Sequence, residues 1–266
     1  MSWDAARAAA FYDDYGECEW TRFEDGRTSH VSLEVHLEYL RRFVRSGDRV
    51  LDAGAGPGRF TIELARLGAE VVPLDLSPRQ LELNRERVAT AGLEDSVRDG
   101  VVGDITDLSQ FEDQWFDHVV CFGGPLSYVV DRANDAVAEL VRVTRTGGHV
   151  LVSAMCLVGA IVHWRDAVLE LAERDGSART EEIVRTGVLP QAPDYGHLEM
   201  KLFRWRELES LLSRHGTIVS ASAAGLLGRA PEPTDPLLTR LEIELAAEPG
   251  ALDCAPHVLA VLRKDQ

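Results

Sequence analysis

Cysteine is scarce in this sequence, and the spacing of the few cysteines argues against a metal site. The 266 residues contain four, at wide and irregular intervals: Cys18, Cys121, Cys156 and Cys254. There is no CxxC pair and no Cys/His cluster with the spacing of a zinc site. We therefore expect no bound metal, and reduced thiols in a cytoplasmic protein.

Basic residues and long apolar runs are lacking as well. Lys and Arg number 28 against 44 Asp and Glu, which gives a formal net charge of −16. This charge opposes contact with a phosphate backbone, so we expect no nucleic-acid partner. The longest apolar run, 150–162, is too short to span a bilayer, and the acidic N-terminus does not resemble a signal peptide. We expect a soluble protein without a membrane partner, and the oligomeric state stays open.

The most informative stretch is 50–60, with the sequence VLDAGAGPGRF. Its apolar start ends at Asp52, and glycines follow at alternate positions, Gly54, Gly56 and Gly58. Apolar residues at helical spacing come next, so the pattern predicts a buried strand, a tight turn and the start of a helix. Glycine permits positive φ angles and lets a ligand approach the backbone closely. Free N–H groups at the helix start would face such a ligand.

This stretch does not match the dinucleotide fingerprint, which needs glycines at relative positions one, three and six. The sixth position is Arg59 when counted from Gly54, and Thr61 when counted from Gly56. The pattern acid-x-Gly-x-Gly-x-Gly instead resembles the first motif of the class I S-adenosylmethionine-dependent methyltransferases. An ordinary glycine-rich turn would have the same pattern in isolation. The resemblance implies S-adenosylmethionine as the cofactor, bound at Asp52 and the three glycines.

A second carboxylate follows at the end of the next strand. There, Asp75 can accept hydrogen bonds from both ribose hydroxyls of an adenosine. Ser77 and Gln80 predict a capping box at the start of the following helix. The stretch resembles the family's second motif, which adds Leu76 to the cofactor residues. Pro73 lacks an N–H group, so it predicts either a gap in the strand ladder or a shorter strand.

Two more strand ends complete the expected cofactor site. The third strand is predicted to end at Asp104, which the resemblance assigns to the adenine amino group, with Ile105 packing near the base. The fourth strand ends at Cys121, and the loop 122–128 would lie beside the methionine part of the cofactor. We therefore include Cys121 among the cofactor residues. This loop lacks the Asp/Asn-Pro-Pro-Tyr/Phe signature of enzymes that methylate amide or adenine nitrogens.

Strands and helices alternate from residue 48 to 155 with the spacing of a parallel, doubly wound α/β sheet. With the resemblance, this predicts a Rossmann-like, mostly parallel seven-stranded sheet with helices on both faces. We divide the chain into an N-terminal helical cap segment (1–47), the cofactor-binding half of the core (48–155), an inserted lid (156–200) and the C-terminal part of the same core (201–266).

The resemblance does not identify the methyl acceptor. Tyr12 and Tyr128 are candidates for the substrate pocket, and His197, where the lid ends, is the preferred acid–base candidate, because a neutral imidazole can take a proton from a hydroxyl. A packing or surface role for His197 is the alternative. We expect a methyltransferase acting on N or O of a small molecule, such as one of specialised metabolism. The alternatives are an aminopropyl- or carboxymethyltransferase, or a non-catalytic cofactor-binding protein.

Overall fold

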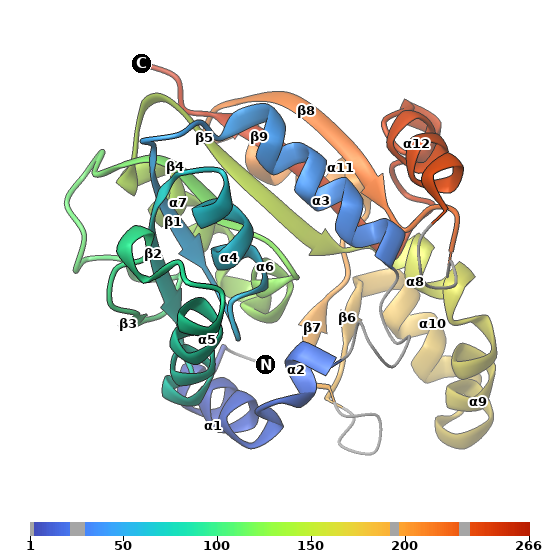
Figure 1. Cartoon of the computed structure of the whole chain (residues 1–266). Helices are drawn as coiled ribbons and strands as arrows, with labels where there is room; N and C mark the ends of the chain where they lie inside the picture. Colours follow the sequence, from blue (N-terminus) through green and yellow to red (C-terminus); the bar gives the residue numbers. More distant parts are fainter. Residues whose placement is uncertain (1–2, 22–29, 192–196, 229–234) are drawn as a thin grey trace.

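A seven-stranded sheet runs through the centre of the molecule (Figure 1). The computed structural model describes residues 3–21, 30–191, 197–228 and 235–266. The strands of this sheet are β1 (Arg49–Ala53), β2 (Glu70–Asp75), β3 (Val101–Val102), β4 (Phe116–Cys121), β5 (Thr144–Met155), β8 (Thr217–Ala224) and β9 (His257–Arg263). Their order is β3-β2-β1-β4-β5-β9-β8. Neighbours from β3 to β5 are parallel, and β9 is antiparallel to β5 and β8, which confirms the mostly parallel sheet.

Helices cover both faces of the sheet because the strands carry apolar residues on each face. The larger helices are α3 (His30–Phe43), α4 (Arg59–Arg66), α5 (Pro78–Thr90), α7 (Ala133–Val143), α11 (Trp205–Leu212) and α12 (Pro236–Leu245). Val50, Leu151 and Val261 pack against α3 and α4 on one face. Leu51 and Val150 pack against α7 and α11 on the other. Helix α5 lies beside α4, and α12 packs against α3 (Figure 1).

One strand boundary departs from the sequence prediction, and of the two alternatives left open at Pro73 the structure shows the gap in the ladder. Strand β3 ends at Val102, so Asp104 lies two residues beyond it instead of at its end. Strand β2 runs through Pro73, which lies opposite Asp52 of β1. The pairing of β2 with β3 begins only at Leu74. The ladder therefore has its gap at Pro73, on the side of β3, where no N–H donor is needed.

The segment 156–200 forms a separate group of helices beside the carboxyl end of β5 (Figure 1). It contains α8 (Leu157–His163), α9 (Arg165–Asp175), α10 (Ser177–Thr186), and a small sheet of β6 (Val188–Leu189) and β7 (Met200–Lys201). Residues 192–196 lie outside the described part. Leu157 and Met200 belong to a small core that also contacts Tyr128. The insertion therefore packs on the loop that follows β4.

The N-terminal segment crosses the edge at which the parallel strands end (Figure 1). It contains α1 (Ala5–Tyr15) and α2 (Cys18–Thr21), and residues 1–2 and 22–29 of the expected cap lie outside the described part. The remaining short helices are α6 (Pro125–Tyr128), η1 (Glu94–Ser96), η2 (Val130–Arg132) and η4 (Pro249–Ala251). Within the described residues, no helix is long and apolar enough to cross a membrane.

Candidate active site

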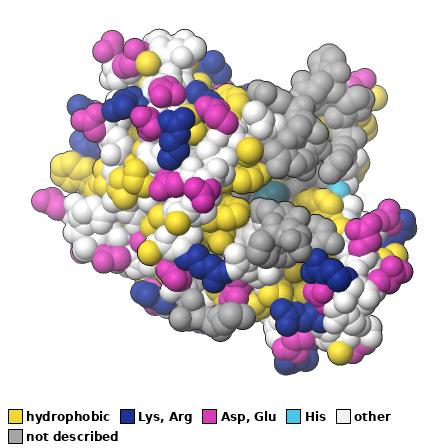
Figure 2. Space-filling model, turned by 90° about the horizontal axis from the view of Figure 1, so that it is seen from below, with side chains coloured by type: hydrophobic (Ala, Val, Ile, Leu, Met, Phe, Trp, Pro, Cys, Tyr) yellow, Lys and Arg dark blue, Asp and Glu magenta, His cyan; other side chains and the backbone are white. Residues whose placement is uncertain are grey.

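A cleft lies between helix α1 and the ends of strands β1, β2 and β4. Small-molecule sites of α/β proteins form at this place, where the parallel strands of the sheet end. The glycine turn after β1, the end of β2 and the loop after β4 form its walls. Figure 2 looks onto this edge of the molecule and shows a hollow near the middle, with apolar side chains around it.

The three glycines of the turn have different roles. All three have positive φ angles, of 79° at Gly54, 50° at Gly56 and 97° at Gly58. A Cβ atom on Gly54 would lie 2.3 Å from Cγ of Pro125, and one on Gly58 would lie 3.1 Å from Cγ of Asn84. A Cβ on Gly56 would meet no atom closer than 3.8 Å. A side chain at Gly54 would therefore clash with Pro125 and one at Gly58 would crowd Asn84, whereas Gly56 exposes its backbone to the cleft.

Asp75 joins the turn to the end of β2. Its Oδ2 accepts a hydrogen bond from the Gly56 N–H at 2.8 Å, and its Oδ1 accepts one from the Ser77 N–H at 2.9 Å. Burial raises the pKa of Asp75 to about 6, although both hydrogen bonds act in the opposite direction. The carboxylate lines the cleft, as expected, and each oxygen has a further lone pair for a ligand hydroxyl.

Asp52 lies behind the turn and does not line the cleft, although it was expected to contact the cofactor. Its Oδ2 accepts a hydrogen bond from Thr61 Oγ1 at 2.6 Å. Asn84 Nδ2 donates to Thr61 Oγ1 at 2.9 Å and to the Gly56 carbonyl at 3.3 Å. Burial raises the pKa of Asp52 to about 7. Cys121, also expected to contact the cofactor, is fully buried and does not line the cleft.

One end of the cleft is apolar and contains the residues expected at the adenine. Leu76 and Ile105 line it, together with Trp3 from the N-terminal segment. Trp3 Nε1 donates to Asp104 Oδ2 at 2.7 Å, and the Thr106 N–H donates to Asp104 Oδ1 at 2.8 Å. Trp3, which no local sequence pattern links to Asp104, therefore fixes Asp104 beside the cleft.

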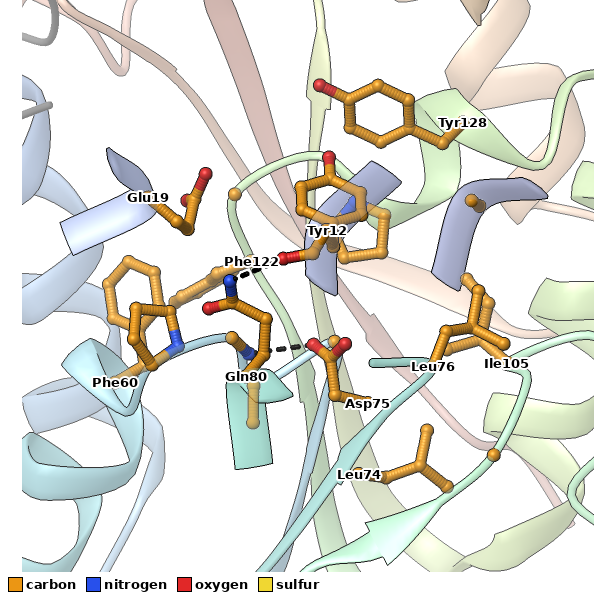
Figure 3. Close-up of a pocket in the computed structure, with 18 of the residues that line it drawn as sticks. Tyr12, Glu19, Phe60, Leu74, Asp75, Leu76, Gln80, Ile105, Phe122 and Tyr128 are labelled. Carbon is orange, nitrogen blue, oxygen red and sulfur yellow. Dashed lines mark hydrogen bonds between the residues drawn. The ribbon is translucent and has the colours of Figure 1, made fainter. Parts of the chain in front are cut away.

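The opposite end of the cleft carries charges of both signs. In Figure 3, Glu19 and Phe60 lie on the side away from Ile105. Arg59, the first residue of α4, also lines the cleft. Its Nη2 donates to the carbonyl of Trp20 at 2.9 Å, and its guanidinium lies 4.0 Å from the centre of that indole. Neither Glu19 nor Arg59 was assigned from the sequence.

Hydrogen bonds from Gln80 of α5 and from its N-cap residue, Ser77, hold the N-terminal segment over the cleft. Gln80 was expected to complete a capping box, but its Nε2 donates to the carbonyls of Tyr12 and Gly16, both at 3.0 Å (Figure 3). Ser77 caps α5 as predicted, since its Oγ accepts the Gln80 N–H at 3.0 Å, and the same hydroxyl donates to Asp13. These hydrogen bonds connect the N-terminal segment to the core at the start of α5.

Of the three residues that the sequence suggested for contact with the acceptor, two line the cleft and one does not. Tyr12 and Tyr128 both line the cleft, with ring centres 5.8 Å apart and planes at 86°. His197 is half-buried, and its Nδ1 lies 2.9 Å from the carbonyl oxygen of Leu198. It does not line the cleft, so its catalytic role stays a prediction.

Comparison with known families supports the interpretation of the turn. Residues 50–148 match the model of a family described as a methyltransferase domain. This match contains the glycine turn, Asp75 and the loop after β4 up to the start of β5. It covers the part of the chain that forms most of the cleft.

Individual proteins are similar over longer stretches. An ubiquinone biosynthesis O-methyltransferase of Xylella fastidiosa is 28% identical over 81% of this chain and 89% of its own. A demethylmenaquinone methyltransferase of Mycobacterium marinum is 40% identical over 43% of this chain and 47% of its own. The chain spans about half the length of most of the curated relatives it matches. The CcbJ methyltransferase from Streptomyces caelestis has the same fold, with a TM-score of 0.64, 14% identity and coverage of 99% and 100% of the two chains.

Proposed function

We propose that this chain, which belongs to the class I S-adenosylmethionine-dependent methyltransferases, transfers a methyl group from S-adenosylmethionine to a hydroxyl of a small organic molecule. The observation that carries the proposal is the geometry at Gly56. Its backbone is open to the cleft, and its N–H is held by the carboxylate of Asp75, which also lines the cleft.

The residues around the cleft fit the parts of this cofactor. Leu76 and Ile105 offer apolar surface to an adenine, and Asp75 offers acceptor lone pairs to the ribose hydroxyls. Glu19 and Arg59, at the other end, carry charges opposite to those of an amino acid's ammonium and carboxylate groups. The order of these residues along the cleft therefore follows the order of adenine, ribose and methionine.

The bound cofactor supplies an activated methyl group, and the chain has to orient the partners and exclude water. Correct positioning alone can contribute roughly 7–11 kcal/mol to lowering a barrier. The N-terminal segment, which Gln80 fastens to the core, covers the cleft and limits the access of water. Tyr12 and Tyr128 form one wall of the cleft, and the acceptor would pass along this wall to reach the methyl group.

A hydroxyl acceptor is supported by the relatives and by the charge of the chain. The relative from Xylella fastidiosa is named as an O-methyltransferase of ubiquinone biosynthesis, which favours a hydroxyl on an aromatic ring. The net charge of −16 opposes a nucleic-acid acceptor. An amine acceptor, an aminopropyl transfer and a purely binding function are the competing possibilities.

Labelled cofactor distinguishes these possibilities. The protein is incubated with S-adenosylmethionine labelled in the methyl group, or with decarboxylated S-adenosylmethionine labelled in the aminopropyl group, together with catechols, phenols, quinols and amines. We expect methyl label in an aryl methyl ether. Aminopropyl label in an amine product would identify an aminopropyltransferase. Binding of S-adenosylhomocysteine without any transfer would identify a cofactor-binding protein.

A further inference from the structure

A second cavity adjoins the cofactor cleft, and we call it the side cavity. It shares three lining residues with the cleft, namely Trp3, Ala8 and Tyr128. Its other walls come from the start of α1, the turn η2 and residues 198–199, which precede β7 of the insertion. The side cavity therefore lies between the N-terminal segment and the insertion, where Tyr128 forms a wall of the cleft.

The two shared aromatic residues indicate where the side cavity joins the cleft. Trp3 Nε1 donates to Asp104 Oδ2 at 2.7 Å, so this indole belongs to the end of the cleft that fits an adenine. Tyr128 is the last residue of α6, in the loop expected beside the methionine part of the cofactor. The reactive methyl group of S-adenosylmethionine lies between these two parts of the cofactor. An acceptor in the side cavity would therefore have a route to it past Tyr128.

Two side chains of opposite charge line the side cavity without pairing with each other. One is Arg7, in the first turn of α1, and the other is Glu199, in the segment before β7. Within the part of the chain that the structure describes, neither of them forms an ion pair. Elsewhere on the surface, arginines pair with nearby acids, as Arg66 does with Glu63. The guanidinium of Arg7 and the carboxylate of Glu199 are thus both available to a ligand.

The backbone that carries each of these charges is held in place. Asp4, which also lines the side cavity, caps α1 because its Oδ1 accepts the backbone N–H of Arg7 at 3.0 Å. Glu199 is half-buried, whereas Leu198 and Met200 on either side of it are buried. The helix cap and the core of the insertion therefore fix the two positions, and the long side chains remain able to reach a ligand.

The side cavity matches a ligand that has an apolar ring and charges of both signs. Val130, Leu198 and Tyr128 offer apolar and aromatic surface to a ring. An anionic ligand would pair with Arg7 but be repelled by Glu199, and a cationic ligand would be in the reverse position. A ligand with both charges forms a charge-assisted hydrogen bond with each side chain. An aromatic α-amino acid has this combination, because its ammonium and carboxylate groups are attached to the same carbon.

We infer that the methyl acceptor is an aromatic α-amino acid with a hydroxyl on its ring, and that the side cavity binds it. Arg7 pairs with its carboxylate and Glu199 with its ammonium group, while the ring passes Tyr128 and directs the hydroxyl into the cleft. This inference rests on the proposed function and names the class of acceptor for it. Arg7 and Glu199 determine specificity only. Neither lines the cofactor cleft, so neither contributes to binding of S-adenosylhomocysteine.

Four catechols that differ in their charged groups test the inference without turnover. L-3,4-dihydroxyphenylalanine carries both charges, dopamine only the ammonium, 3-(3,4-dihydroxyphenyl)propionate only the carboxylate, and 4-ethylcatechol neither. Each is titrated by calorimetry, at neutral pH, into the protein saturated with S-adenosylhomocysteine. We expect dihydroxyphenylalanine to bind about tenfold or more tightly than dopamine or the propionate, because each of these lacks one charge-assisted hydrogen bond.

Two variants should divide the four ligands in different ways. Arg7→Gln should weaken binding of the two ligands that carry a carboxylate by about tenfold, and leave the other two unchanged. Glu199→Gln should do the same to the two ligands that carry an ammonium group. The matched controls are Arg240→Gln and Glu244→Gln on the exposed face of α12, and both should bind all four ligands like the wild type.

The outcomes separate this inference from the proposed function. Equal losses for all four ligands in either variant, or a response of only one variant, would overturn the inference. Transfer of methyl label to 4-ethylcatechol without the expected differences in affinity would leave the proposed function intact and reject an amino acid acceptor. The expected differences in affinity without methyl label in any of the four catechols would reject the proposed function, and with it the role of the amino acid as acceptor.

Discussion

The Oδ2 atom of Asp75 accepts a hydrogen bond from the backbone N–H of Gly56 at 2.8 Å. The end of the second strand thereby fixes the middle of the glycine turn that follows the first. The other carboxylate oxygen accepts the Ser77 N–H at the start of α5. One side chain thus sets the shape of the turn and presents its remaining lone pairs to the cleft.

Replacing Asp75 with Asn should weaken binding of S-adenosylhomocysteine. The substitution keeps the size of the side chain and one acceptor oxygen, but its NH2 group accepts neither a ribose hydroxyl nor the backbone N–H of Gly56 or Ser77. The expected cost is about 1–3 kcal/mol, or roughly 5–150-fold in Kd. Calorimetric titration measures this. The control is D95N, which removes the same charge at an exposed position. Wild-type affinity in D75N would show that the carboxylate does not contact the ribose.

Arg59 should discriminate between two ligands that differ only at one end. 5′-Methylthioadenosine lacks the amino acid part of S-adenosylhomocysteine, so the Arg59→Met variant should lose affinity for S-adenosylhomocysteine by about tenfold or more and keep its affinity for methylthioadenosine. The matched control is Arg66→Met, at the exposed end of the same helix. Equal losses for both ligands would indicate general damage to the cleft.

Because of Asp52, the free energy of unfolding should decrease as the pH rises. Its pKa in the folded protein, about 7, lies above its ordinary value near 4, because burial disfavours the charged form. Between these two values the folded state binds more protons than the unfolded state, so the free energy of unfolding falls with increasing pH. The Asp52→Asn variant lacks this dependence.

The difference in stability between Asp52→Asn and the wild type should therefore change by about 2–3 kcal/mol between pH 5 and pH 8, in favour of the variant at pH 8. Urea unfolding at both pH values measures it. The exposed D95N variant should show no comparable change. A difference that is constant with pH would mean that Asp52 is not buried as a high-pKa carboxyl.

The insertion 156–200 should behave as a lid. Helix α9 has no buried residue and carries Arg165 and Arg174, so trypsin should cut it readily in the free protein. Bound S-adenosylhomocysteine together with a catechol should slow cleavage there, because the insertion packs on Tyr128, which lines the cleft. Cleavage after exposed Arg214 provides an internal reference. Equal rates with and without ligands would count against a lid.

The local patterns of the sequence predict the strands and the turn because neighbouring residues determine them. Strand β4 ends at Cys121 as predicted, and Ser77 caps α5. The role of Asp52 was not predicted, because Thr61, in the first turn of α4, donates a hydrogen bond to its carboxylate from behind the glycine turn. The link from Trp3 to Asp104 spans 101 positions, and no local pattern reports such a contact.

The measurement that tests the central claim most directly is the titration of S-adenosylhomocysteine into the wild type and two glycine variants. A valine at position 56 or 92 meets a positive φ angle, of 50° or 67°, but only Gly56 lines the cleft. A Cβ on Gly92 would meet no atom within 4 Å. We predict binding by the wild type and Gly92→Val, and none by Gly56→Val. Undiminished binding by folded Gly56→Val would contradict the assignment of the cleft.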